Sequence, residues 1–277
     1  MKLTLTTLGE NTAGNPSLLG ELGLSILIEA ESTTILLDTG QNISVTHNID
    51  FLGVDPDRID KIVLSHGHFD HTGGLRMLLQ RIRRRVEIIG HPDIWAAKYD
   101  RRENRPERYI GIPFQKTELE SLGARFHLSR EPVVLADGIM TTGELPMKAE
   151  FETIDPHLFV REGNEFKPDP LLDDQAVIIN TGNGLVIVLG CAHRGMINTI
   201  NHAQRLTGVK DINLVIGGSH LIGTSEERVW LTIAALKELQ VQRIGLCHCT
   251  SLPAAAMMAQ EFGDRFFFNN AGNRIEL

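Results

Sequence analysis

The 277-residue sequence predicts a layered α/β fold in which sheets are covered by helices. From residue 61 onward, one local order occurs four times: an apolar stretch with strand character, a polar ending, and then a segment with helical periodicity. The N-terminal part differs, because it reads as consecutive strands joined by a turn. This mixture favours sheets flanked by helices over a simple doubly wound sheet.

The elements follow in order along the chain. The first strands are expected in residues 1–10, where apolar and polar residues alternate, and in 22–40, where two apolar runs flank a polar turn. The four strand and helix pairs are 61–68 with 74–85, 184–193 with 195–206, 212–220 with 224–240, and 243–249 with 252–262. Thr224 and Glu227 predict a capping box, Pro253 a first helical turn, and Gly208 and Gly263 helix ends.

Residues from about 91 to 170 have a different texture, with eight prolines scattered among charged residues and short apolar pieces. Little periodicity is present there, so an independent domain is not indicated. We expect a single domain, residues 1–277, in which this interval is an insertion that covers the site.

The composition narrows the class of protein. With a formal net charge of -8, the chain is not expected to bind nucleic acid, and an anionic substrate would need a local basic pocket. The sequence shows neither a signal peptide nor an apolar run long enough to span a membrane. Three cysteines, two of them separated by one residue, suit a reducing cytoplasm better than a disulfide framework.

A cluster of titratable side chains follows the strand at residue 61, in the stretch HGHFDH. His66 and His68 stand two apart, so an extended backbone sends both imidazoles to one side, and Gly67 lets the chain pass close to what they hold. Asp70 and His71 follow a bend and can reach a second point nearby. Imidazole and carboxylate suit Zn, Mn or Fe, and two adjacent metals could share such a cluster.

The order His66-x-His68-x-Asp70-His71 resembles the signature of the metallo-beta-lactamase superfamily, and ILLDTG at 35–40 resembles its first motif. The later segments TGELP, DDQAVII, GLVIVLGCAHRG, GGSHL and CHCT narrow the resemblance to the subgroup of dihydropterin ribofuranosylaminobenzene-phosphate synthases. The resemblance implies an αββα sandwich of two mixed sheets flanked by helices, with a dinuclear metal site at one edge.

The resemblance also implies the ligands of two divalent transition metals, with Zn favoured and Mn or Fe as alternatives. One metal would be held by His66, His68 and His193, and the other by Asp70, His71 and His248. Asp38 would support the metal-binding loop from behind these ligands.

Cys191 is a departure from the superfamily, which usually has a bridging aspartate after the equivalent of this strand. Cys191 could bridge the metals as a thiolate, could be a buried bystander, or could be replaced as bridge by Asp173 or Asp174. Cys247 and Cys249 flank His248, and strand alternation predicts that both point away from it into the core.

These ligands predict a metal-dependent hydrolase or related transferase that uses a hydroxide activated by two metals. Asp70 would both ligate and orient, and His220 would assist the leaving group or contact a phosphate; the alternative for His220 is a hydrogen-bonded histidine at a strand end. The basic residues between Lys98 and Arg108 would form either a mobile cover with anion contacts or a solvated loop.

The favoured substrate is a small phosphorylated or pterin-like compound. A general phosphodiesterase or a lactone hydrolase is the alternative within the same class. From another class, the fold could serve as a non-catalytic, metal-dependent ligand binder or carrier in cofactor biosynthesis.

Overall fold

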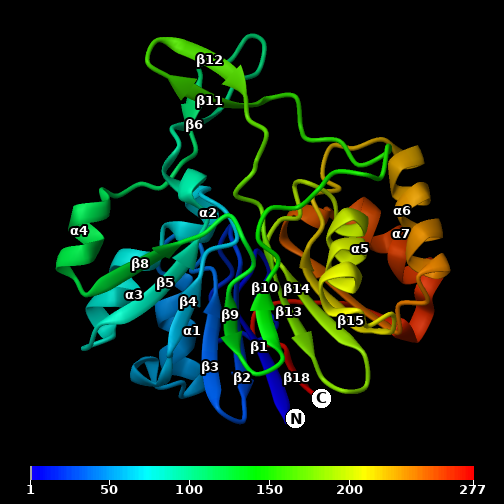
Figure 1. Ribbon diagram of the computed structural model, residues 1–277, viewed down its shortest axis with the longest axis horizontal. Helices are drawn as coiled ribbons and strands as arrows, with labels where there is room; N and C mark the ends of the chain where they lie inside the picture. Colours follow the sequence, from blue (N-terminus) through cyan, green and yellow to red (C-terminus); the bar gives the residue numbers. More distant parts are fainter. Residues whose placement is uncertain (1) are drawn as a thin grey trace.

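The computed structural model describes residues 2–277, in which two seven-stranded sheets pack face to face between helices (Figure 1). The first sheet has the order β18 (Arg274–Glu276), β1 (Leu3–Gly9), β2 (Ser25–Ala30), β3 (Thr33–Leu37), β4 (Lys61–Val63), β5 (Val86–Gly90) and β8 (Ala124–Leu128). The second has the order β17 (Phe266–Phe268), β16 (Arg243–Cys247), β15 (Ile212–Gly218), β14 (Leu185–Leu189), β13 (Ala176–Asn180), β10 (Ile139–Thr141) and β9 (Val134–Ala136).

Both sheets are mixed. In the first, β18, β1, β2 and β3 pair antiparallel, and β3, β4, β5 and β8 pair parallel. In the second, β9, β10, β13 and β14 pair antiparallel, and β14, β15, β16 and β17 pair parallel. Because the carboxyl ends of the parallel strands lie at one end of the sandwich, the loops that follow them converge there.

The helices lie on the two outer faces (Figure 1). On the first sheet these are α1 (Ser44–Leu52), α3 (Leu75–Arg81) and α4 (Lys116–Ser121), and on the second α5 (Met196–Thr207), α6 (Glu226–Glu238) and α7 (Leu252–Phe262). The single turn α2 (Phe69–Thr72) follows β4. Short 3-10 turns occupy Pro56–Arg58, Pro92–Trp95, His248–Thr250 and Gly263–Arg265.

Strand alternation explains the layers of the core. In β14, Val186 and Val188 pack against the first sheet, whereas Ile187 packs against the helices of the second. A third cluster fills the space between the first sheet and its own helices, with Leu36 and Ile88 against Leu78. Each sheet is therefore buried on both faces, which matches the long apolar runs of the sequence.

This architecture confirms the layered α/β class and the αββα arrangement. All four predicted strand and helix pairs are present, as β4 with α3, β14 with α5, β15 with α6, and β16 with α7. The cap of α6 differs by one residue from the prediction, because Ser225, and not Thr224, accepts the hydrogen bond from the backbone N–H of Arg228. Gly208 ends α5 in a left-handed conformation, as expected.

The interval 91–170 divides between two places in the structure. β8 and β9 are edge strands of the two main sheets and β10 pairs with β9, whereas a small third sheet projects from the end of the sandwich at the top of Figure 1. Its order is β12 (Glu165–Pro168), β11 (Leu158–Glu162), β6 (Lys98–Asp100) and β7 (Arg108–Tyr109). This small sheet stands at the end where the carboxyl ends of the parallel strands meet.

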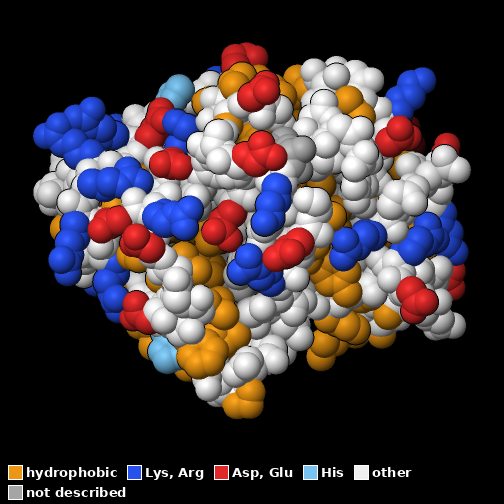
Figure 2. Space-filling view, turned by 90° about the horizontal axis from the view of Figure 1, so that it is seen from below, with side chains coloured by type: hydrophobic (Ala, Val, Ile, Leu, Met, Phe, Trp, Pro, Cys, Tyr) orange, Lys and Arg blue, Asp and Glu red, His pale blue; other side chains and the backbone are white. Residues whose placement is uncertain are grey.

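The end of the sandwich opposite the small sheet carries charges of both signs, with hydrophobic side chains between them (Figure 2). Within residues 2–277, no helix is both long and apolar enough to cross a membrane.

Candidate metal centre

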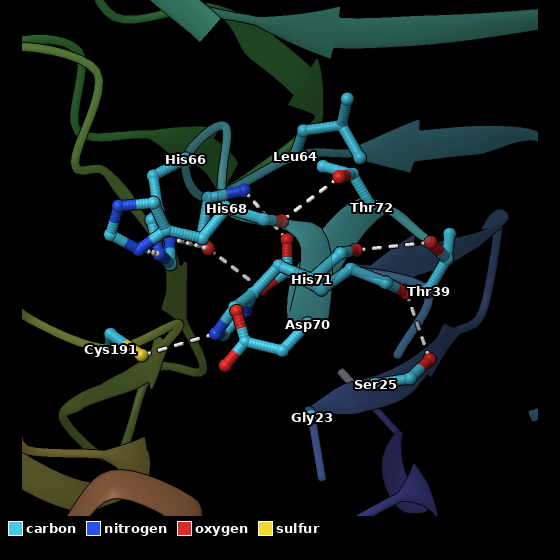
Figure 3. Close-up of polar contacts among 12 residues, drawn as sticks. Gly23, Ser25, Thr39, Leu64, His66, His68, Asp70, His71, Thr72 and Cys191 are labelled. Carbon is cyan, nitrogen blue, oxygen red and sulfur yellow. Dashed lines mark hydrogen bonds and ion pairs between the residues drawn. The ribbon is translucent and has the colours of Figure 1, made fainter. Parts of the chain in front are cut away.

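The first donor group, His66, His68 and His193, consists of three imidazoles at the ends of β4 and β14. His66 Nε2 lies 2.9 Å from His68 Nδ1 and 3.2 Å from His193 Nε2, and all three residues are buried. Figure 3 shows the His66 and His68 rings close together. Around a tetrahedral zinc with Zn–N bonds of 2.0–2.1 Å, ligand nitrogens are separated by about 3.3 Å. The three nitrogens therefore fit one shared cation.

The protonation state of this group suits metal binding. Burial lowers the pKa of His66, His68 and His193 well below the ordinary value, and neighbouring positive groups lower it further. These imidazoles are neutral at neutral pH, so each keeps a nitrogen lone pair for a ligand bond.

The second donor group, Asp70, His71, Cys191 and His248, combines oxygen, nitrogen and sulfur. His71 Nε2 lies 3.2 Å from His248 Nε2 and 3.0 Å from Cys191 Sγ, the contact drawn as a dashed line in Figure 3. Asp70 Oδ2 lies 3.4 Å from His248 Nε2. Burial opposes ionisation of Asp70, but His71 and His248 outweigh it and hold the pKa of this carboxyl well below its usual range. Asp70 is therefore an anionic donor.

Asp38 holds the second group from behind. It follows β3, is fully buried, and its Oδ2 lies 2.6 Å from His71 Nδ1. The same carboxylate accepts hydrogen bonds from Ser65 N and Ser65 Oγ, both at 2.7 Å. Accepting the Nδ1–H of His71 leaves Nε2 directed at the centre of the group. Burial lowers the pKa of His71, but Asp38 and Asp70 outweigh it and raise it to about 9.

Cys191 lies between the two groups, with its sulfur within 4.8 Å of ring nitrogens of both His66 and His71. Asp173 and Asp174, the sequence alternatives for the bridge, do not join these clusters of donor atoms among the described residues. Asp174 Oδ2 accepts the backbone N–H of Arg194 at 2.8 Å. The structure therefore places the sulfur, and neither of these carboxylates, between the groups.

Asp173 belongs to a buried network that sequence reasoning missed. Its Oδ2 accepts the N–H of Gly67 at 2.8 Å, and its Oδ1 pairs with Lys98 Nζ at 2.9 Å. Lys98 also pairs with Asp169 at 2.7 Å and is only 1% exposed. The prediction that Lys98 belongs to a cover or solvated loop with the other basic residues up to Arg108 is wrong for this residue. Its position in a run of charged residues carries no signal of burial.

Gly67 must be glycine for a steric reason, because a Cβ there would lie 2.2 Å from the carbonyl oxygen of Ile94. The peptide between His66 and His68 is thus clamped between Ile94 and Asp173. This clamp fixes where the two imidazoles can point.

A cavity of about 850 Å³ opens above both groups. His68, Asp70, His193 and His248 line it, as does His220. Both ring nitrogens of His220 are buried without a hydrogen-bond partner among the described residues, and its ring centroid lies 4.0 Å from that of His193. The structure thus brings His220 beside the first group.

Further walls of the cavity come from the small sheet and from the residues that precede β11. They include Arg102, Arg108 and residues 153–158. Arg102 pairs with Asp100 and Asp155. Arg101, from the same basic segment, instead stacks 4.1 Å above the Phe166 ring and does not line the cavity. The segment is therefore divided between cavity wall and outer surface.

The sandwich and its histidine-lined edge are those of a known class of protein. The chain belongs to the metallo-beta-lactamase superfamily, whose family model matches residues 19–239. Over 99% of its length, it is 37% identical to the 7,8-dihydropterin-6-methyl-4-(beta-D-ribofuranosyl)-aminobenzene-5'-phosphate synthase of Methanocaldococcus jannaschii, of which the match covers 96%.

Solved structures agree with this placement. The crystal structure of Tm1679, a metal-dependent hydrolase of the beta-lactamase superfamily, has a TM-score of 0.86 and 26% identity over 99% of both chains. The metallo-beta-lactamase fold protein YhfI from Bacillus subtilis has a TM-score of 0.63 and 14% identity over 100% of both chains, a likeness of fold alone.

Proposed function

We propose that this protein is a metal-dependent hydrolase or closely related transferase that acts on a small, anionic, phosphorylated or pterin-like substrate. One observation carries the proposal: His66, His68, His193, Asp70, His71 and His248 bring their ligand atoms together in two groups at the floor of one cavity. Two divalent metals bound there, with zinc favoured, would supply an activated water and polarise the bond to be broken.

The chain's own residues supply orientation and proton transfer. Asp70 lies in the second group and lines the cavity, so it would both help to hold a metal and orient the attacking water. His220 donates a proton to the leaving group, since its unpartnered ring lines the same cavity beside His193. Cys191, whose sulfur lies within 4.8 Å of ring nitrogens in both groups, would help to hold the metals as a thiolate.

The walls support an anionic substrate. Arg108 lines the cavity and lies over the ring of Phe69, which offers a charge beside a flat apolar surface. Arg228 lines it from α6, where its Nη1 donates to the carbonyl oxygen of Thr153 at 2.7 Å. Such walls fit a ring system that carries a phosphate, the kind of compound in the name of the relative from Methanocaldococcus jannaschii.

We further propose that the small sheet acts as the cover of a single domain spanning 1–277. The protein would work in the cytoplasm, where its three free cysteines remain reduced.

The test combines metal analysis with two esters. Protein made with ample Zn, Mn or Fe should contain close to two metals per chain and hydrolyse both an anionic phosphodiester and a small neutral ester. His68→Ala should lose metal and at least about 100-fold of both activities, because an essential ligand is removed. Arg108→Ala should raise KM for the anionic ester alone.

The exposed His127 is a matched control, and His127→Ala should change neither metal content nor activity. Metal-free protein after growth in ample metal would contradict the proposal. Metal-loaded protein that binds anionic ligands but turns over no ester would instead support a binding or carrier role.

A further inference from the structure

Cys249 lies beside the second donor group, although it was expected to point into the core. Its sulfur, the sulfur of Cys191 and a ring nitrogen of His248 all lie within 4.8 Å of one another. Cys249 is 8% exposed and lines the cavity. Because Cys191 and His248 already belong to the second group, Cys249 adds a second sulfur to it.

The backbone explains this placement. β16 ends at Cys247, and the chain then enters a 3-10 turn in which His248 has a positive φ of 54°. Strand alternation therefore stops one residue before Cys249, so His248 and Cys249 reach the same cluster. Cys247 obeys the alternation and packs in the core between the sheets, with its sulfur 3.7 Å from Asn269 Nδ2.

Neighbouring side chains hold the strained residue in place. The backbone N–H of His248 donates to Glu10 Oε1 at 2.8 Å, and His248 Nδ1 lies 2.9 Å from Asn11 Oδ1. A non-glycine residue with positive φ costs about 1 to 3 kcal/mol and persists where its surroundings hold it, often at a functional site. The turn is thus braced from β1 and the residues that follow it.

The two groups now differ in donor chemistry. Apart from Cys191, whose sulfur is near both groups, the first group offers imidazole nitrogens, whereas two triads meet at His248 in the second: one with Asp70 and His71, the other with Cys191 and Cys249. These are more donors than a four-coordinate ion uses. Thiolate donors favour ions such as Zn²⁺ over Mn²⁺, which prefers carboxylate oxygen. Two thiolates on one tetrahedral zinc would lie about 3.8 Å apart, from Zn–S bonds of 2.3 Å.

We propose that Cys249 is a thiolate ligand of the metal at the second position, together with Cys191, and that this pair makes the position selective for thiophilic divalent ions. The proposal rests on the metal dependence proposed above. On metal binding, the Cys249 thiol releases one proton and gives up its 3.6 Å contact with the carbonyl oxygen of Cys191. The Cys249 sulfur keeps the hydrogen bond that it accepts from the backbone N–H of His220 at 3.2 Å.

Cobalt titration of the metal-free protein tests the ligand. Filling the second position should produce a strong sulfur-to-metal absorption, and Cys249→Ser and Cys249→Ala should each lower it by about half, since one of two thiolate ligands is lost. Cys247→Ser is the matched control on the other side of His248 and should keep the full band. An unchanged band in both Cys249 variants, with cobalt still bound, overturns the proposal.

Competition between Cd²⁺ and Mn²⁺ for the second position gives its first result on the native protein alone. The native second position should prefer Cd²⁺ strongly, and Cys249→Ser should narrow the preference by about 10- to 100-fold. No preference for Cd²⁺ in the native protein contradicts the sulfur pair. Two bound cobalt ions without a sulfur band would refute this proposal but leave the metal-dependent function standing, whereas failure to bind any metal would overturn both.

Discussion

The two donor groups are built at the same end of the sandwich and share one support, Asp38 at the end of β3. Asp38 binds His71 of the second group directly. It reaches the first group only through Ser65, whose Oγ lies 2.7 Å from Asp38 Oδ2 and 2.9 Å from His66 Nδ1. The first group is also held through Asp173 and Lys98, and Lys98 lies on β6 of the small sheet. The two groups can therefore respond differently to changes in these supports.

The two donor groups are also joined to the small sheet in different ways. The small sheet also lines the cavity, so a substrate that contacts it is linked through Lys98, Asp173 and Gly67 to the first donor group. The second group meets the small sheet by another route, because the backbone N–H of Phe69, next to Asp70, donates to the carbonyl oxygen of Ile110, just after β7, at 2.9 Å.

The largest effect is expected from Asp38→Ala. The change leaves the Nδ1–H of His71 and the N–H of Ser65 without their buried acceptor, which should cost about 3 to 5 kcal/mol of the free energy of unfolding. Metal should be lost from the second position first. Denaturant titration and metal analysis measure the two effects.

Asp50→Ala provides the control, because Asp50 forms an exposed ion pair with Arg81. It should leave metal content unchanged. Equal loss of metal from both positions in Asp38→Ala would contradict the closer tie of Asp38 to the second group.

A smaller effect, which falls on the first metal position and not on the second, is expected from Lys98→Met. The change leaves Asp169 and Asp173 buried together without their cation and loosens the hold on Gly67. Affinity at the first position should fall about 10- to 100-fold, while the sulfur-to-cobalt band of the second position persists. Titration against a chromophoric chelator gives the affinities.

Lys61→Met is the matched control, since Lys61 pairs with Glu87 at a partly exposed site. Little change in metal affinity is expected from it. A loss of affinity shared equally by both positions of Lys98→Met would show a general loosening of the fold.

The smallest effect concerns Glu152, whose carboxylate accepts the N–H groups of Ile197 and Asn198 at the start of α5. Burial raises the pKa of Glu152 to about 7, although these two N–H groups oppose the rise. The folded protein therefore holds this proton more tightly than the unfolded chain does. Through this group, the free energy of unfolding should decrease by about 2 kcal/mol as pH rises from about 5 to 8.

Glu152→Gln should remove that part of the pH dependence, as measured by denaturant titration of both proteins across this range. Glu150→Gln, at an exposed position on the same segment, is the control and should retain it. Parallel pH profiles for the native protein and Glu152→Gln would contradict the assignment. Because Glu152 joins the cavity wall to the helix after His193, any accompanying change in metal affinity should fall on the first position.

The fold class and the local part of the centre could be predicted from residues that are close together in the chain. Strand and helix periodicities depend on neighbouring residues, so the four strand and helix pairs could be predicted without knowledge of their partners. The spacing of His66 and His68 likewise acts over two residues of extended chain. The inclusion of His193 and His248 came from resemblance, and the structure brings both to the same edge.

Other features of the site depend on contacts between segments that are distant in the chain. Lys98 lies in a run of charged residues that reads as exposed, yet two carboxylates 71 and 75 residues away compensate its burial. Cys249 reads as a core residue, yet the positive φ of His248 lets its sulfur lie near Cys191 and His248. Both outcomes depend on groups distant in sequence: a buried charge is stable only beside its counterions, and a strained turn only where other segments brace it.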